Sequence, residues 1–311
     1  MHDGGRRAII AAFFANLGIA VSKFVGFLLT GSAGLAAESV HSLADTANQG
    51  LLMLGGSRAA RGQDEDHPFG HERERYFWAF IVALILFSMG GLFALYEGIN
   101  KLRHPHETES LGIALVILGV AIVLEAFSLR TAVRETAKVK PAGQGYWQFV
   151  RHAKQPELPT VLLEDVAAQA GLVIAFVGVL LGHLTHEPRW DAAGSVAIGV
   201  LLIVVAVILG VEMKSLLIGE SASPADRTAL ADALLGAEHV EDVIHMRTEH
   251  LGPDSLLVAA KVIFDPALPA GDVSRAIDAA EKRMRKAVPA ARFIFIEPDT
   301  ARDPDAPGDG A

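Results

Sequence analysis

Four polar side chains recur at helical spacing inside an otherwise apolar stretch of this chain. Steps of three and four residues place them on one face of a helix, with His41 and Asp45 one turn apart. A charged side chain at the middle of a bilayer costs on the order of 3 kcal/mol, so a partner, a water-filled cavity or a bound cation is required. A His and an Asp at this spacing supply two ligands of a divalent metal site. The four residues are Glu38, His41, Asp45 and Asn48.

A second polar set, Glu164, Asp165 and Gln169, lies in a later apolar stretch. Asp165 and Gln169 share a helical face, whereas Glu164 is turned by about 100° from Asp165. If the two stretches pack together, Asp165 is expected to meet the His and the Asp of the first set around one ion.

Other uses of these intramembrane charges stay open. The alternative to an ion site is a network of hydrogen bonds or ion pairs that fastens helices together. No Lys or Arg lies deep in the two polar stretches to pair with the acids, which disfavours such a network, and Lys23 in the first span is the nearby deep base. Glu97 and Glu125 are compatible both with an ion pathway and with end residues whose carboxylates reach the membrane surface.

The composition indicates a multi-span membrane protein. The chain has 311 residues, of which 51% are hydrophobic, and its mean hydropathy is +0.35, whereas soluble domains rarely have a positive average. The net charge of -9 gives no indication of nucleic-acid binding, and no nucleic-acid partner is expected. With no cysteines, any metal site must use imidazole nitrogen and carboxylate oxygen.

Six apolar segments are each long enough to cross about 30 Å of hydrocarbon as a helix. The first is interpreted as an uncleaved span rather than a signal peptide, because its apolar run is long. Lys and Arg gather on alternate connections, which predicts that both termini are cytoplasmic. The segments lie near 8–30, 33–56, 76–100, 110–132, 160–184 and 191–213.

The chain changes character after Lys214, where hydrophobicity falls to that of a soluble domain. Helix and strand signals then follow in the order helix, strand, strand, helix, strand, which predicts a small cytoplasmic α+β domain. The expected division is a transport domain 1–214, a C-terminal domain 215–299 and a disordered tail 300–311. The second helix of this domain is expected to bury one apolar face. That face consists of Val273, Ile277, Ala280 and Met284.

With these features the sequence resembles the cation diffusion facilitator family, whose members are proton-coupled exporters of zinc and related divalent ions. The resemblance covers residues 8–299 and implies six transmembrane helices and a ferredoxin-like C-terminal domain. It also implies a homodimer in the lipid bilayer. The motifs that carry it are HSLAD (41–45), HPFGHER (67–73), LLEDVAA (162–168), DAAGSVAIGVLL (191–202) and KSLLIGES (214–221).

The resemblance implies a transport site made by the second and fifth spans. The second-span positions fall on His41 and Asp45, and the later fifth-span position falls on Asp165. The earlier fifth-span position falls on Val161, which cannot bind a metal ion. A histidine in the set favours zinc over harder ions such as manganese. The replacement for the missing ligand is Glu164, Glu38 or water, unless the site is three-coordinate at rest.

The resemblance also points to a second metal site in the loop after the second span. Asp64, His67 and His71 occupy that region, in DEDHPFGHE. Asp64 and His71 fit the family's positions best. The alternative is a solvated loop without metal.

The function expected from these features is secondary transport by alternating access. A divalent cation, zinc above Fe²⁺, Co²⁺ or Mn²⁺, leaves the cytoplasm as protons replace it, because ligands must lose protons to bind metal. The alternative is a metal sensor or scaffold with a degenerate site. An enzyme is not expected, since the HExxH motif of many metalloproteases is absent. The expected location is a bacterial inner membrane, as a multi-pass protein.

Overall fold

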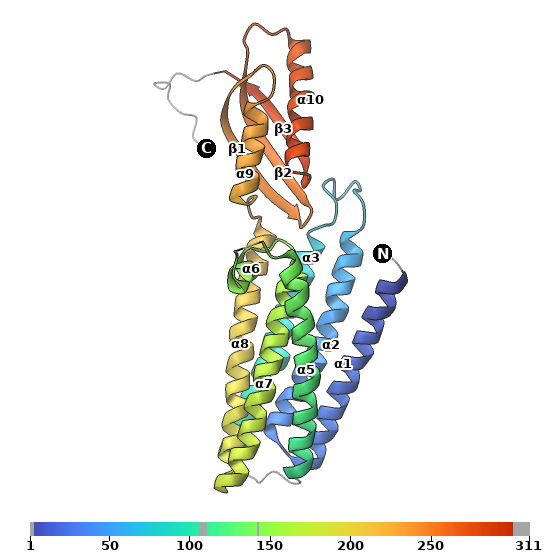
Figure 1. The fold of residues 1–311 in the computed structure, drawn as a ribbon, viewed down its shortest axis with the longest axis vertical. Helices are drawn as coiled ribbons and strands as arrows, with labels where there is room; N and C mark the ends of the chain where they lie inside the picture. The colour runs from blue at the N-terminus through green and yellow to red at the C-terminus, as the bar shows by residue number, and fades with distance from the viewer. Residues whose placement is uncertain (1–2, 106–110, 142, 301–311) are drawn as a thin grey trace. The chain divides into compact units, whose positions relative to one another are not determined.

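The computed structural model describes residues 3–105, 111–141 and 143–300, which form two compact units (Figure 1). One unit comprises Met1–Gly62 and Glu74–Lys214, and the other combines Gln63–Arg73 with Ser215–Ala311. The predicted disordered tail lies outside the described residues, apart from Thr300.

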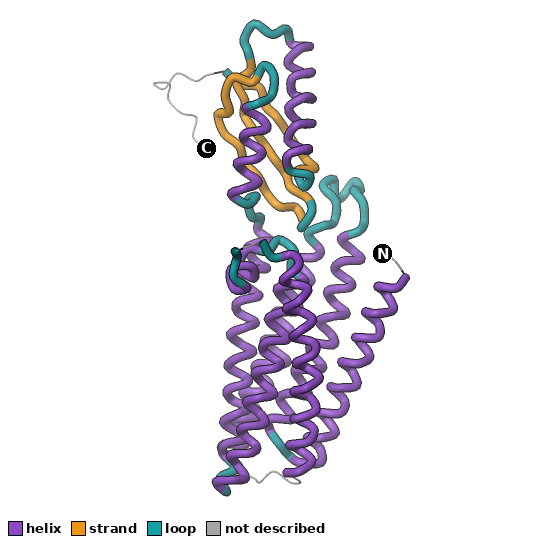
Figure 2. Tube along the Cα trace, viewed as in Figure 1, coloured by secondary structure: helices purple, strands orange, loops and turns teal. Residues whose placement is uncertain are grey.

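The first unit is helical, and each of the six apolar segments coincides with helix (Figure 2). The third segment runs without a break through two α-helices and a π-helical stretch between them. The helices are α1 Asp3–Thr30, α2 Ala33–Ala59, α3 Glu74–Ile85, η1 Leu86–Leu92, α4 Phe93–Arg103, α5 Leu111–Val139, α6 Tyr146–His152, α7 Glu157–Thr185 and α8 Arg189–Ile218.

Four helical stretches in the described part of the chain are long and apolar enough to cross a membrane. They are α3 to α4 taken as one, α5, α7 and α8, and α1 adds a shorter apolar stretch, Leu17–Thr30. The α2 helix has 27 residues, but its polar residues lower its hydropathy. The count of six spans therefore stays a prediction at α1 and α2.

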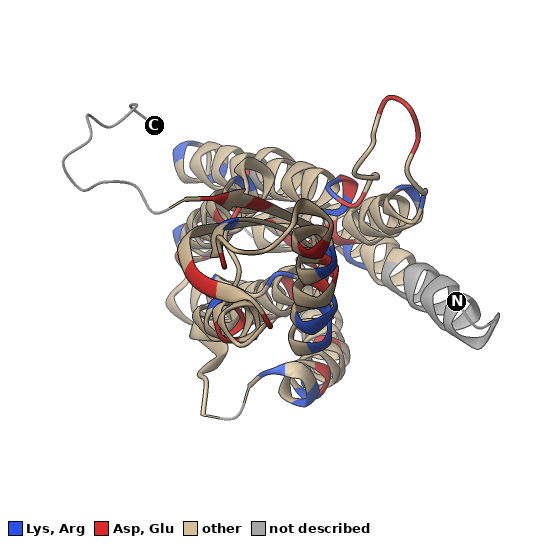
Figure 3. Cartoon of the chain, turned by 90° about the horizontal axis from the view of Figure 1, so that it is seen from above, with Lys and Arg blue, Asp and Glu red and all other residues tan. Residues whose placement is uncertain are grey.

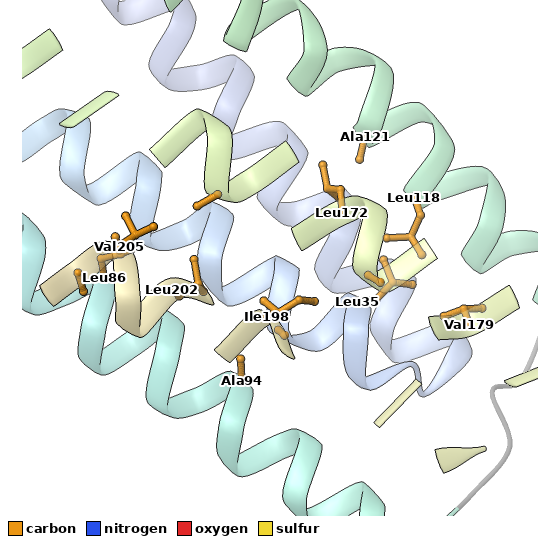
Figure 4. Close-up of a cluster of buried hydrophobic side chains, with 14 of the residues drawn as sticks. Leu35, Leu86, Ala94, Leu118, Ala121, Leu172, Val179, Ile198, Leu202 and Val205 are labelled. Carbon is orange, nitrogen blue, oxygen red and sulfur yellow. The ribbon is translucent and has the colours of Figure 1, made fainter. Parts of the chain in front are cut away.

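Large apolar side chains lie both in the core between these helices and on their outer surface. Leu35, Leu118 and Ile198 are fully buried in the core that Figure 4 shows. On the outer surface, Val116 and Phe127 of α5 are 66% and 63% exposed. Exposure of this extent is rare on a soluble protein, whereas a helix whose backbone groups are bonded internally can face lipid. The surface of the unit therefore suits a bilayer.

Glycines let α2 and α7 approach each other closely. A Cβ atom on Gly34 of α2 would lie 3.0 Å from the Cβ of Ala175 in α7. On Gly171 of α7, a Cβ would lie 2.4 Å from Oε1 of Glu38. Small residues at such positions are how membrane helices pack tightly, and here they bring the two polar stretches together.

A buried ion pair holds the first residues of α2. Lys101 of α4 donates to Oδ2 of Asp191 in α8 at 2.8 Å, and both side chains are almost fully buried. The Asp191 carboxylate also accepts from the backbone N–H of Ala33 and Gly34 and from the Ser32 hydroxyl. These N–H groups have no partner within their own helix, and an anion there is stabilised by the helix dipole. The network therefore fixes where α2 begins.

The second unit contains a three-stranded sheet in the order β1-β2-β3. The β1 strand (Val240–Gly252) is antiparallel to β2 (Ser255–Phe264), which is parallel to β3 (Ala291–Asp299). Two helices, α9 (Pro224–Leu235) and α10 (Ala270–Ala287), pack on the buried face of the sheet. The predicted order of helices and strands is confirmed.

The loop Gln63–Arg73 groups with the sheet unit and not with the helical unit, and the predicted division into domains 1–214 and 215–299 stays a prediction. Arg73 forms an ion pair with Glu249 of β1, and Glu72 pairs with Arg292 of β3 at 2.7 Å. The ring of Phe69 meets that of Phe293 edge to face, with centroids 5.2 Å apart. These contacts join the loop to strands that are distant in sequence.

Candidate functional site

The polar face of α2 is buried, as predicted. Glu38, His41 and Asn48 are fully buried, and the Asp45 side chain is 19% exposed. Nδ1 of His41 lies 3.5 Å from Oδ1 of Asp45. Among the described residues, neither ring nitrogen of His41 has a hydrogen-bond partner. Because a buried polar group without a partner is costly, this imidazole is suited to receive an ion or a water molecule.

The two acids of α7 face different helices. The Glu164 carboxylate accepts a hydrogen bond from the Asn48 amide of α2 at 2.7 Å. The Asp165 carboxylate accepts one from the Ser128 hydroxyl of α5 at 3.0 Å. The angle of about 100° between consecutive helical residues accounts for this difference. Glu164 is thus the α7 acid hydrogen-bonded to α2, whereas the sequence favoured Asp165.

One pocket nevertheless contains acids from both polar stretches. Asp45, Glu164 and Asp165 all line it, and Val161 lies among them. His41 adjoins this set through Asp45. The packing of α2 against α7 therefore brings the predicted site residues into one region, with an apolar side chain where the family pattern has a ligand.

Glu38 lies in an ion pair and is not among the residues that line this pocket. Lys23 of α1 donates to Oε2 of Glu38 at 3.2 Å and to the Ser42 hydroxyl at 2.7 Å, and all of these groups are buried. The other oxygen, Oε1, lies against the backbone of α7 at Gly171. The ammonium group of Lys23 thus balances the charge of the Glu38 carboxylate. The sequence showed Lys23 as a nearby deep base, but the lack of bases within the polar stretches had been counted against an ion-pair network, and the pair with Glu38 was not predicted.

Three side chains of the loop form a compact cluster in the sheet unit. Asp64 Oδ1 lies 3.2 Å from His67 Nδ1, and Asp64 Oδ2 lies 2.8 Å from His71 Nε2. One ligand atom of each residue lies within 4.8 Å of the others, and no other described set of three His or acidic residues meets that limit. The loop is acidic, with Asp64, Glu65 and Asp66 in sequence. Figure 3 draws the Asp and Glu residues of the chain in red.

The Asp64 carboxylate gives the loop cluster a negative charge, which suits a cation. The hydrogen bond to His71, and next the backbone N–H of His67, lower the pKa of Asp64 to about 2. The carboxylate is therefore ionised at neutral pH. Gly70, whose φ is +86°, gives the turn that returns the chain to His71.

The structure adds residues that sequence reasoning did not assign to the site. Asn48 had been placed on the polar face, but its bond to Glu164 was not foreseen. Ser128 and Glu125 of α5 line the pocket together with the acids of α7. A signal for these two exists, because their spacing of three residues repeats the pattern of a polar helix face.

Comparisons with known proteins identify what the helical unit resembles. A family model described as a cation efflux transmembrane domain matches residues 9–218. The mouse (Mus musculus) proton-coupled zinc antiporter SLC30A9, mitochondrial, is 35% identical over 244 residues, which are 78% of this chain and 43% of that protein.

Two further relatives come from a plant and a bacterium. Metal tolerance protein C4 of Arabidopsis thaliana is 30% identical over 261 residues, which are 84% of this chain and 57% of that protein. The cation-efflux pump FieF of Pectobacterium atrosepticum is 24% identical over 302 residues, 96% of this chain and 94% of that protein. The chain spans about half the length of the mouse and plant relatives.

Proposed function

Because the chain belongs to the cation diffusion facilitator family, we propose that it exports zinc from the cytoplasm in exchange for protons. Family membership assigns the chain to transport and not to catalysis. The observation that carries the proposal is the fully buried His41, whose ring nitrogens have no described partner and which lies 3.5 Å from Asp45. The mouse relative is named a proton-coupled zinc antiporter, which supports zinc over other divalent ions.

The proposed transport site takes ligands from α2 and α7. His41 and Asp45 supply a nitrogen and an oxygen from α2, and this mixed set suits zinc. Asp165 and Glu164 supply oxygens from α7. Val161 lines the same pocket without a donor atom, so Glu164, hydrogen-bonded to Asn48 of α2, takes the place of the fourth ligand. Glu38 remains with Lys23 and acts outside the ligand set.

Proton coupling follows from the charges of this site. A ligand must be deprotonated to bind a metal ion. When the ion leaves, several carboxylates and an imidazole remain close together in an apolar bundle, and like charges at such distances oppose joint ionisation. Protons then neutralise the site, and the empty bundle can return to the cytoplasmic side.

The wider arrangement extends this proposal. We expect a multi-pass protein with both termini in the cytoplasm, working as a homodimer in the bilayer through the ferredoxin-like domain of its family. Relatives include a mitochondrial antiporter and a bacterial pump, so a bacterial inner membrane stays a prediction.

The loop cluster is proposed to bind a second divalent ion. Replacing Asp64 with Asn should weaken zinc binding at this site by at least about tenfold, because the variant loses the charged group that bridges both histidines. Zinc titration of the purified chain by calorimetry checks this, with Asp66→Asn as the matched control in the same loop. An unchanged number of bound ions and unchanged affinities in Asp64→Asn would refute the loop site.

The transport proposal is tested in proteoliposomes. An acidic lumen should accelerate zinc uptake by the wild-type chain, since protons leave as zinc enters. Uptake is followed with a zinc-sensitive dye trapped inside. Zinc binding without uptake at any pH gradient would instead support a sensor or scaffold.

A further inference from the structure

An ionisable side chain, Glu125, lies at the middle of α5. Glu125 has 14 residues of helix on each side of it within Leu111–Val139. At about 1.5 Å per residue this places it roughly 21 Å from both helix ends. Glu125 is therefore an interior residue of α5 and not a residue at either end of this helix.

One face of α5 contains the buried apolar residues of this helix together with Glu125, which is half-buried, and Ser128, which is exposed. Ala114, Leu118, Ala121 and Ala132 are the buried apolar residues of this face. Glu125 and Ser128 continue the same spacing of three and four residues between Ala121 and Ala132. The opposite surface, with Val116 and Phe127, is exposed. The row of buried apolar residues is therefore interrupted by two polar residues, of which the exposed Ser128 contacts α7 through Asp165.

These two residues meet the proposed transport site. Ser128 donates to Oδ2 of Asp165 at 3.0 Å. Glu125 lines the same pocket as Asp45 and Asp165, and its charge acts on both of these acids. The lining of the pocket thus comes from four helices, α1, α2, α5 and α7.

We propose that Glu125 is a further ligand of the transported ion, supplied by α5; this inference rests on the proposed transport function. The pocket has Val161 at one position on the α7 side, and a carboxylate from α5 supplies oxygen to an ion that is also bound by Asp45 and Asp165. Ser128 is a positioning residue that acts through Asp165. The site then draws on three helices.

A competing role for Glu125 is to balance the charge of Lys23. The ammonium group of Lys23 acts electrostatically on Glu125, but its hydrogen bonds go to Glu38 and Ser42. A structural partner would affect stability without zinc, whereas a ligand affects zinc binding. The two roles are therefore distinguished by measuring stability in the absence of zinc and zinc binding separately.

The test compares Glu125→Gln and Glu125→Asp with Glu135→Gln, an exposed acid on the same helix that pairs with Lys138. The purified full-length chain is melted with and without zinc, and the KM for zinc uptake is measured in proteoliposomes. Glu125→Gln should raise the KM by at least about tenfold and reduce the rise in Tm that zinc produces. Glu125→Asp should recover part of both losses, and Glu135→Gln should match wild type.

The proposal is overturned if Glu125→Gln keeps a KM within about twofold of wild type and an unchanged zinc-dependent rise in Tm. It is also overturned if the variant loses stability only in the absence of zinc. If the wild-type chain binds zinc but transports none, the transport function fails while the melting comparison still decides the role of Glu125. Should Glu125→Gln fail to fold, Glu125→Asp and Ser128→Ala are compared in the same way.

Discussion

Replacing Asp45 with Ala is expected to reduce zinc uptake by about 100-fold or more, because the variant loses the carboxylate shared by the His41 pair and the pocket. The fold should persist, since Oδ1 of Asp45 has no hydrogen-bond partner within the described structure. Zinc uptake into proteoliposomes under an imposed pH gradient measures the loss. Asp66→Ala in the exposed loop is the control and should transport as wild type does.

The α7 side of the site is examined with the same assay. Asp165→Ala should lower uptake strongly, and Glu164→Ala should do so as well if it replaces the ligand missing at Val161. Normal uptake by both Asp45→Ala and Asp165→Ala would contradict the site assignment. Loss in Glu164→Ala with normal uptake in Asp165→Ala would make Glu164 the α7 ligand.

Replacing Lys101 with Met is expected to lower the free energy of unfolding of the helical unit by about 3–5 kcal/mol. The change leaves the buried Asp191 carboxylate without the ammonium group that lies 2.8 Å away. Thermal unfolding in detergent micelles, followed by circular dichroism, measures the effect. The exposed Lys138–Glu135 pair gives the control, because Lys138→Met should change stability by only about 0.5 kcal/mol.

A second variant separates charge from packing in this network. Asp191→Asn added to Lys101→Met removes the uncompensated charge and should recover part of the lost stability. An unchanged unfolding temperature in Lys101→Met would show that the ion pair contributes nothing to stability. A double variant less stable than Lys101→Met would show that the hydrogen bonds of Asp191 to the start of α2 dominate.

Periodicity in the sequence was enough to predict the helices and the polar face of α2. Apolar segments in lipid must satisfy their own backbone groups, so long apolar runs indicate helices. The spacing of Glu38, His41 and Asn48 predicted that they share one face of α2, because the sharing of a face depends only on the helical period. In the sheet unit, Ala280 and Met284 of α10 are fully buried, as the apolar pattern predicted.

Contacts between distant segments could not be predicted in this way. The rotation of α7 about its axis decides whether Glu164 or Asp165 faces α2, and that rotation depends on close packing at Gly171 and Ala175. The loop Gln63–Arg73 joins the sheet unit through pairs with Glu249 and Arg292 that have no local sequence signal. Hydropathy also did not indicate the π-helical turn Leu86–Leu92 within the third segment.

Coupled movement of zinc and protons is the most direct test of the proposed exchange. Proteoliposomes containing the wild-type chain, with a pH-sensitive dye inside and equal pH on both sides, receive zinc outside. Entry of zinc should raise the lumenal pH in proportion to uptake, and neither change should occur with Asp45→Ala. Zinc entry without a change in lumenal pH, or equal zinc and pH responses in Asp45→Ala, would contradict exchange at the site between α2 and α7.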